Sequence, residues 1–329
     1  MRRTWILMAA CAITLSAVEA FACTGLLVGK KASVDGSVMI SYAADSHTLY
    51  GELYRWPAAT WLKGAMLDII EWDTHKPLGQ IPQVEQTYSV VGNMNEHQVA
   101  ITESTFGGRS ELVDTTGIMD YGSLIYVTLQ RSKTAREAIR IMTDLVKDYG
   151  YYSSGETFSI ADKNEAWVME MIGKGPGNKG AVWVAIRIPD DCISAHANQS
   201  RIQQIPFDDK ENCIYSPDVV SFAREKGYFS GKDKDFSFQK AYCPYDFSAL
   251  RGCEARVWSF FRKYDKSMDQ YTDLIKGDVT KKPMPLYVKP NRLLSVQDVQ
   301  NGMRDHFEGT DLDMTKDAGA GPYKVPYRW

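Results

Sequence analysis

The sequence predicts an α+β fold in which sheets stack face to face and helices cover their outer sides. Two observations predict it: segments with strand character alternate with amphipathic helical segments, and each kind occurs in two separate groups. The chain of 329 residues is 44% hydrophobic and 24% charged, a composition that can bury one large core or two medium ones. We find no internal repeat or low-complexity tract in this order.

The first group of strands is indicated by short apolar runs bounded by polar turns, at 26–28, 38–40, 88–91 and 99–102. Two helices follow, at 121–131 and 134–149. In the second helix the apolar residues fall on one face at helical spacing, and Thr134 with Glu137 matches a capping box.

The second group of strands is predicted at 157–161, 166–172, 181–188 and 193–197. In the third of these, apolar residues alternate with others, as expected of a strand with one buried face. Helices are then expected at 216–226, 253–263 and 295–307, and the polar, aromatic stretch 228–250 is expected to be a long loop.

Residues 1–22 are typical of a secretory signal peptide. Arg2 and Arg3 precede an apolar stretch, and Ala20 and Ala22 are small residues at the two positions that a signal peptidase recognises. The stretch is too short to span a bilayer comfortably. We therefore expect export to the periplasm or the extracellular space, and a domain over 23–329 with no transmembrane segment. The formal net charge of −3 gives no reason to expect a nucleic-acid partner.

Five cysteines follow the predicted signal, and this odd number indicates one free thiol. In an oxidising compartment most cysteines pair. The simplest arrangement has disulfides Cys192–Cys213 and Cys243–Cys253 and leaves Cys23 free, although spacing does not fix the connectivity.

Cleavage after Ala22 would give Cys23 both a thiol and a free α-amine. Because an α-amine has a pKa of about 7.7–8.0, part of it is uncharged near neutral pH and can accept the proton of the thiol. One residue would then supply both nucleophile and base. Two alternatives stay open from the residues alone: Cys23 is a lipid-attachment cysteine, or it is an ordinary residue near a strand.

Blocks along the chain resemble the dipeptidase A family of N-terminal-nucleophile hydrolases, which are related to penicillin V and bile-salt amidases. The resemblance begins with CTGLLVGKKASVDGS at 23–37 and continues with NMNE at 93–96, FSIAD at 158–162, WVMEMIGKG at 167–175, SAHANQSRI at 194–202, MRDHFEGT at 303–310 and GPYKVPYRW at 321–329. It spans nearly all of residues 23–329. Members of this family usually continue well past such a terminus, so we expect the domain to be truncated at its C-terminal end.

The resemblance implies a four-layer αββα sandwich and amide hydrolysis through an acyl-enzyme on Cys23. Asp45 matches an acid that contacts the α-amine, and Asn198 matches the side chain that donates to the oxyanion. Arg256 matches an arginine of the related amidases. Tyr42 departs from the pattern, because those amidases carry an arginine there, whose charge would lower the thiol pKa.

We expect two further residues to contact substrate. Glu103 is expected to bind the ammonium group of a dipeptide, and a backbone donor near the end of the 99–105 strand, at Thr105, is expected to assist at the oxyanion. His196 is interpreted as a strand histidine rather than a residue of the pocket. No metal or cofactor is expected, because the five histidines lack metal-binding spacing.

We therefore interpret the chain as an exported cysteine dipeptidase. The alternative within enzymes is an N-acyl amide hydrolase of the penicillin V or bile-salt type. The alternative from another class is a lipid-anchored binding protein in which Cys23 is acylated. Assembly into a homo-oligomer is left open.

Overall fold

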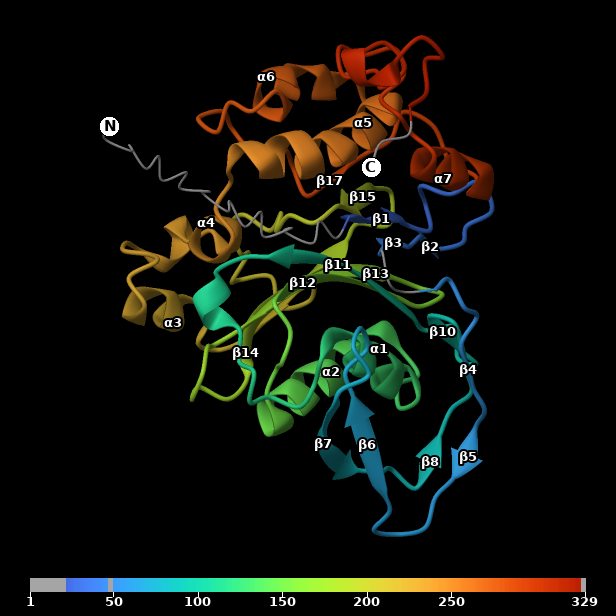
Figure 1. The fold of residues 1–329 in the computed structure, drawn as a ribbon, viewed down its shortest axis with the longest axis vertical. Coiled ribbons are helices and arrows are strands. Elements are labelled where there is room, and N and C mark those ends of the chain that lie inside the picture. The colour runs from blue at the N-terminus through green and yellow to red at the C-terminus, as the bar shows by residue number, and fades with distance from the viewer. Residues whose placement is uncertain (1–21, 47–49, 327–329) are drawn as a thin grey trace, which may run out of the picture.

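The computed structural model describes residues 22–46 and 50–326 (Figure 1). The predicted signal peptide, residues 1–22, lies outside the described residues except for Ala22. Within the described ranges, no helix has both the length and the apolar character needed to cross a membrane.

The first sheet is built around β1, which carries Cys23. It has five antiparallel strands in the order β17, β15, β1, β2, and β3 pairs with the start of β1. Their bounds are β1 (Ala22–Val28), β2 (Met39–Ile40), β3 (Ala43–Asp45), β15 (Ile193–His196) and β17 (Tyr287–Val288).

The second sheet has eight strands in the order β16, β14, β13, β12, β11, β10, β9, β4. Their bounds are β4 (Arg55–Trp56), β9 (Val90–Val91), β10 (Met94–Asn95), β11 (Ala100–Gly107), β12 (Gly155–Ala161), β13 (Ala166–Gly173), β14 (Ala181–Ile188) and β16 (Cys213–Tyr215). Every residue of β12 and β13 is buried, so both faces of the sheet are covered.

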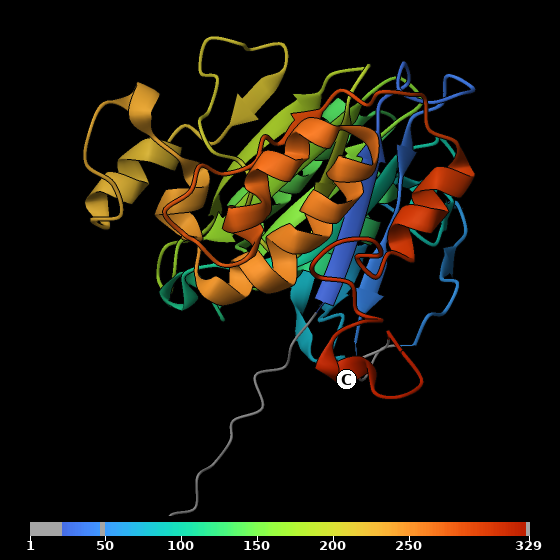
Figure 2. The same cartoon turned by 90° about the horizontal axis from the view of Figure 1, so that it is seen from above.

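Helices lie on the outer side of each sheet (Figures 1 and 2). One apolar cluster joins α1 and α2 to the second sheet, and another joins α5 and α7 to β1 and β15 of the first sheet. The seven α-helices of the described residues are α1 (Tyr121–Leu129), α2 (Ala135–Tyr149), α3 (Val219–Glu225), α4 (Phe238–Tyr242), α5 (Ala255–Tyr264), α6 (Thr272–Ile275) and α7 (Val296–Met303).

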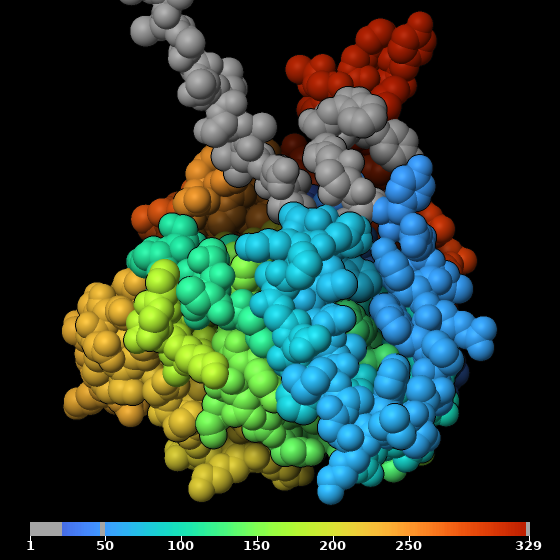
Figure 3. Space-filling model, turned by 60° about the horizontal axis from the view of Figure 1, so that its bottom comes forward, coloured from blue at the N-terminus to red at the C-terminus, as the bar shows by residue number. Residues whose placement is uncertain are grey.

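Two small antiparallel ribbons, which the sequence did not predict, extend from this core. They are formed by β5 (Ala59–Thr60) with β8 (Gln86–Thr87) and by β6 (Met66–Ile70) with β7 (Pro77–Pro82). Figure 3 shows this part of the chain, in blue and cyan, packed beside the green segment that contains α1 and α2. Short 3₁₀ turns and one π turn complete the structure: Ser110–Leu112, Asp233–Asp235, Ala249–Glu254 (π), Lys266–Tyr271 and Ala318–Ala320.

The predicted α+β class is confirmed, and most predicted elements are present within a few residues of their expected bounds. The clearest agreement is α2, where the Thr134 side chain accepts from the Glu137 amide. The predicted capping box is only half formed, because the Glu137 carboxylate accepts from the amide of Lys133 instead of that of Thr134.

Two expectations are wrong. The loop expected at 228–250 contains α4, and the helix expected at 295–307 ends at Met303. The backbone leaves helical geometry at Arg304, and Phe307 has a φ of 62°.

The predicted Cys192–Cys213 disulfide is wrong, because both thiols are free. Cys192 lies in the turn before β15, whereas Cys213 is the first residue of β16. The carbonyl of Cys192 accepts from the amide of Gly29 at the end of β1, whereas Cys213 pairs with Ile186 at the edge of the second sheet. Sequence spacing carries no information on this separation.

The predicted Cys243–Cys253 disulfide is also wrong, because both thiols are free. The Cys243 thiol lies 3.6 Å from the carbonyl oxygen of Phe106. Cys253 lies in the π turn before α5, where its thiol interacts with Arg256. The two thiols therefore contact different groups.

Candidate active site

Cys23 lies at the start of β1 and lines a cavity of about 220 Å³. Its strand partner in β3 is Ala44, and Ala22 pairs with Asp45, so the β1–β3 pairing places Asp45 on the rim of the same cavity. Cys23 is only 4% exposed. The local fold therefore buries the thiol at the bottom of a small, partly open space.

The pKa of the Cys23 thiol is raised to about 12, mainly by burial and then by the negative charges of Glu103 and Glu156. Hydrogen bonds from the Asp45 amide and the Asn198 side chain oppose this rise. The thiol is therefore neutral near pH 7 in this chain. Because Cys23 follows Ala22, its nitrogen is a peptide amide, which is not a base. Thiolate formation would need a base that this form does not supply.

Asn198 contacts the backbone nitrogen of Cys23. Its Oδ1 accepts from that nitrogen at 2.6 Å and from Nη2 of Arg256 at 2.9 Å, while its Nδ2 donates to the carbonyl oxygen of Thr105 at 2.7 Å. Donors on one side and an acceptor on the other fix the orientation of the amide. Asn198 has a φ of 54°, a left-handed conformation that asparagine tolerates better than most residues.

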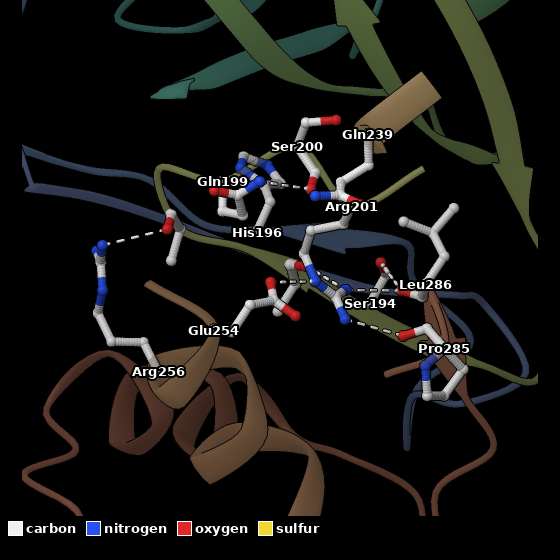
Figure 4. Close-up of polar contacts among 12 residues, drawn as sticks. Ser194, His196, Gln199, Ser200, Arg201, Gln239, Glu254, Arg256, Pro285 and Leu286 are labelled. Atoms are coloured by element: carbon white, nitrogen blue, oxygen red, sulfur yellow. Dashed lines mark hydrogen bonds and ion pairs between the residues drawn. The ribbon is translucent and has the colours of Figure 1, made fainter. Parts of the chain in front are cut away.

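Arg256 extends from α5 toward the strands of the first sheet (Figure 4). Its Nη1 donates to the carbonyl oxygen of Cys23 at 2.6 Å and to Oγ1 of Thr24 at 3.0 Å, and its Nη2 donates to the carbonyl oxygen of Ala197 at 3.2 Å. One planar guanidinium therefore joins the backbone carbonyl of Cys23 to that of Ala197, the residue before Asn198.

Two buried carboxyl groups, Glu103 and Glu156, lie beside Cys23 in the cavity. Glu156 pairs with Thr105 across β11 and β12, so the side chains of Glu103, Thr105 and Glu156 share one face of the sheet. Oε1 of Glu103 accepts from the Tyr42 hydroxyl at 2.6 Å, and Oε1 of Glu156 accepts from Oγ1 of Thr105 at 2.7 Å.

Burial raises the pKa of both glutamates, and for Glu156 the charge of Glu103 raises it further. The two carboxyl groups lie close enough to affect each other's titration. No protein donor among the described residues reaches Oε2 of either carboxyl. The pair therefore retains unused capacity to accept hydrogen bonds.

The cavity as a whole is acidic. None of its described lining residues is basic, and five carry carboxyl groups: Asp45, Glu71, Asp73, Glu103 and Glu156. Burial raises the pKa of Asp45, against the opposing charge of Arg256. Tyr42, at the position where the amidases carry an arginine, donates to Glu103 and adds no positive charge. The cavity is suited to a cationic group.

His196 is confirmed as a buried strand histidine and does not line the cavity. Its ring nitrogens lie 2.6 Å from Oγ of Ser104 and 2.7 Å from Oγ of Ser159, so the ring joins the two sheets. Burial lowers the pKa of His196 to about 3 and keeps it neutral. Its close approach to β1 requires Gly25, where a Cβ would lie 2.5 Å from the ring.

A buried ion pair supports the segment that carries Asn198 (Figure 4). Nε of Arg201 lies 2.8 Å from Oε1 of Glu254, and its Nη1 and Nη2 donate to the carbonyl oxygens of Ala195 and Pro285. Both charged side chains are almost fully buried. Neither was predicted as functional, and a buried pair of this kind acts by fixing the backbone around it.

The structure thus brings together all six residues expected at the site. Cys23, Asp45, Glu103 and Thr105 line one cavity, and Asn198 and Arg256 bond to the backbone of Cys23. The sequence analysis did not predict Glu156 as a site residue. The sequence indicates it only as an acidic residue near the start of an otherwise apolar strand. The catalytic roles themselves stay predictions.

A cysteine held by an asparagine and an arginine beside an acidic cavity defines a candidate thiol-dependent enzyme. The model of peptidase family C69 matches residues 22–54 and 51–329. The chain belongs to this family. The resemblance to the dipeptidase A family is thereby confirmed.

Curated relatives carry dipeptidase names. The chain is 28% identical over 332 residues to a "Probable dipeptidase" of Latilactobacillus sakei, covering 94% of this chain and 66% of that protein. It is 27% identical to a "Probable dipeptidase" of Salmonella dublin (92% and 70%) and 26% identical to "Dipeptidase A" of Lactobacillus helveticus (93% and 66%). The chain therefore spans about two thirds of the length of these relatives.

Proposed function

We propose that the chain is an exported cysteine dipeptidase in which removal of residues 1–22 makes Cys23 the nucleophile and its own α-amine the base. The observation that carries the proposal is the 2.6 Å hydrogen bond from the Cys23 nitrogen to Oδ1 of Asn198. An α-amine at this position would keep the same acceptor, which would orient it beside the thiol. The negative charge of Asp45, on the cavity rim, would favour the protonated form of this amine during the reaction.

The reaction proceeds in two halves. The amine takes the thiol proton, sulfur attacks the peptide carbonyl, and the tetrahedral intermediate collapses when the ammonium returns its proton to the leaving amine. Water then loses a proton to the amine and attacks the thioester, and the released sulfur regains that proton. Asn198 has one Nδ2 hydrogen beyond the bond to Thr105, and this hydrogen would stabilise the oxyanion together with a backbone donor near the end of β11.

The acidic cavity supports a dipeptide as substrate. The ammonium group of a dipeptide would supply the donors that Oε2 of Glu103 and Oε2 of Glu156 lack. A cavity of about 220 Å³ has room for little more than the N-terminal residue, so Cys23 would cleave the first peptide bond. An N-acyl amide lacks this charge, which disfavours a penicillin V or bile-salt type of substrate. The burial of Cys23 disfavours a lipid anchor.

The layered arrangement supports the same proposal. We infer that the two sheets with their outer helices form the αββα sandwich of N-terminal-nucleophile hydrolases. The predicted export and the predicted continuation of the domain beyond residue 329 stay predictions.

The test is turnover of a dipeptide panel by chains with different N-termini. A chain beginning at Cys23 is expected to hydrolyse free dipeptides, and N-acetylated forms of the same dipeptides should be poor substrates, because acetylation removes the ammonium charge. Equal hydrolysis of free and acetylated forms would contradict the role of the acidic cavity.

A further inference from the structure

A second cavity, of about 270 Å³, adjoins the acidic one. The two share Ala44 and Tyr121 in their linings, and Ala44 is the strand partner of Cys23. Half of the residues that line the second cavity are aromatic. We call it the aromatic cavity.

The walls of the aromatic cavity are stacked rings. Trp56 of β4 and Tyr126 of α1 lie with centroids 4.9 Å apart and planes 8° apart, and Trp72 packs edge-on against Tyr54 at 4.7 Å. Trp72 also lies 6.2 Å from Tyr126, so one continuous cluster joins β4, the segment after β6, and α1. Rings held by one another present a preformed apolar surface, which binds an apolar group with little loss of conformational entropy.

Tyr42 and Tyr121 separate the two cavities. Both residues line the aromatic cavity, yet the hydroxyl of Tyr42 donates to Glu103 and that of Tyr121 donates to Oδ1 of Asp73 at 2.8 Å. Glu103 and Asp73 both line the acidic cavity. The partition is therefore aromatic on one side and polar on the other.

We propose that the aromatic cavity binds the side chain of the substrate's N-terminal residue and selects a large apolar or aromatic one. This inference rests on the proposed function. With the ammonium at Glu103 and the scissile carbonyl at Cys23, the Cα between them lies along the shared wall. Its side chain then enters the cavity beyond Ala44 and Tyr121, whose volume of about 270 Å³ has room for an aromatic side chain.

The experiment compares Phe-Ala, Ala-Phe and Ala-Ala as substrates of the chain that begins at Cys23. Burial of a benzyl group predicts a kcat/KM for Phe-Ala about 10- to 100-fold above that for Ala-Ala. Ala-Phe should show no comparable gain, because its aromatic ring lies on the other side of the scissile bond.

Trp56→Leu is expected to lower the ratio of Phe-Ala to Ala-Ala turnover by about tenfold, and Trp56→Phe to restore most of it. Trp61→Leu is the matched control, since Trp61 is an exposed tryptophan that lines neither cavity. Its ratio should equal that of the wild type. Thermal unfolding of each variant identifies any that fail to fold.

Equal turnover of all three dipeptides, or a preference for Ala-Phe, would overturn the aromatic subsite while leaving the dipeptidase proposal intact. An unchanged ratio in a folded Trp56→Leu would also overturn it. Absence of turnover of every dipeptide would overturn both proposals together.

Discussion

The backbone nitrogen of Cys23 donates a 2.6 Å hydrogen bond to Oδ1 of Asn198, which lies 175 residues further along the chain. The other end of the same amide donates to Thr105, and Arg256 donates to the shared oxygen. The two functions proposed for Asn198, holding the amine and stabilising the oxyanion, thus belong to different atoms of one side chain and can be tested apart.

Asn198→Ala is expected to lower kcat by about 10²- to 10³-fold with a smaller effect on KM, because the donor acts on charge that develops in the transition state. Asn198→Asp keeps the oxygen that accepts from the amine but removes the Nδ2 donor. Steady-state kinetics of both variants separate the two functions. A kcat for Asn198→Asp near that of the wild type would show that Nδ2 has no part in catalysis.

Arg256→Lys tests whether catalysis needs the several hydrogen bonds of the guanidinium or only its positive charge. A lysine cannot reach Cys23, Thr24 and Ala197 together, so we expect kcat to fall by about tenfold or more through misplacement of the nucleophile. The KM for a dipeptide should change less, since Arg256 does not line the acidic cavity. A variant with a raised KM and an unchanged kcat would place Arg256 in substrate binding instead.

Glu103→Gln should lower the pKa of the Cys23 thiol below its value of about 12 in the chain that keeps Ala22, because the negative charge of Glu103 raises it. The measurement is the rate of alkylation of Cys23 as a function of pH, read by mass spectrometry. Glu225→Gln is the control, an exposed glutamate on α3 that does not line the cavity. Identical profiles for Glu103→Gln and the wild type would show that Glu103 does not act on the thiol.

We expect the buried His196 to make the stability of the folded chain depend on pH. Its pKa is lowered from 6.5 to about 3 by burial, so below pH 6.5 the unfolded state binds a proton that the folded state does not. Its contribution to stability is therefore present above pH 6.5 and is lost as the pH falls toward 3. Between pH 7 and pH 5 this single group should cost about 2 kcal/mol of unfolding free energy.

His196→Gln keeps hydrogen-bonding capacity toward Ser104 and Ser159 but does not titrate. Urea unfolding at pH 7 and pH 5 should therefore show a smaller loss for this variant than for the wild type. Equal losses would mean that His196 is charged in the folded state or that its pKa is unchanged on folding.

The elements that the sequence predicted well are those with a strong local signal. Helix α2 combines apolar residues at helical spacing with the Thr134 cap. Strand β14 is present as its alternation predicted, but the expected single buried face is wrong, because apolar clusters cover both of its faces. The ribbons between residues 59 and 87 were missed, because short strands with many exposed residues carry little periodicity. The disulfides were wrong, because spacing along the chain does not say which thiols face each other.

At the site, the chemistry of Cys23 was predictable from its position after a signal-like segment. The contacts of Asn198 and Arg256 came only from family resemblance, since no local pattern links residues 23, 198 and 256. Glu156 could not be predicted, because its partner depends on the register of β11 and β12. Long-range pairing is the information that a single sequence lacks.

Dipeptide hydrolysis by two purified chains, one beginning at Cys23 and one keeping Ala22, tests the central claim most directly, with intact mass confirming each N-terminus. The chain that begins at Cys23 should be active, and the chain that keeps Ala22 should be inactive, because an amide nitrogen cannot accept the thiol proton. Equal activity of the two chains would contradict the claim that the α-amine of Cys23 is the catalytic base.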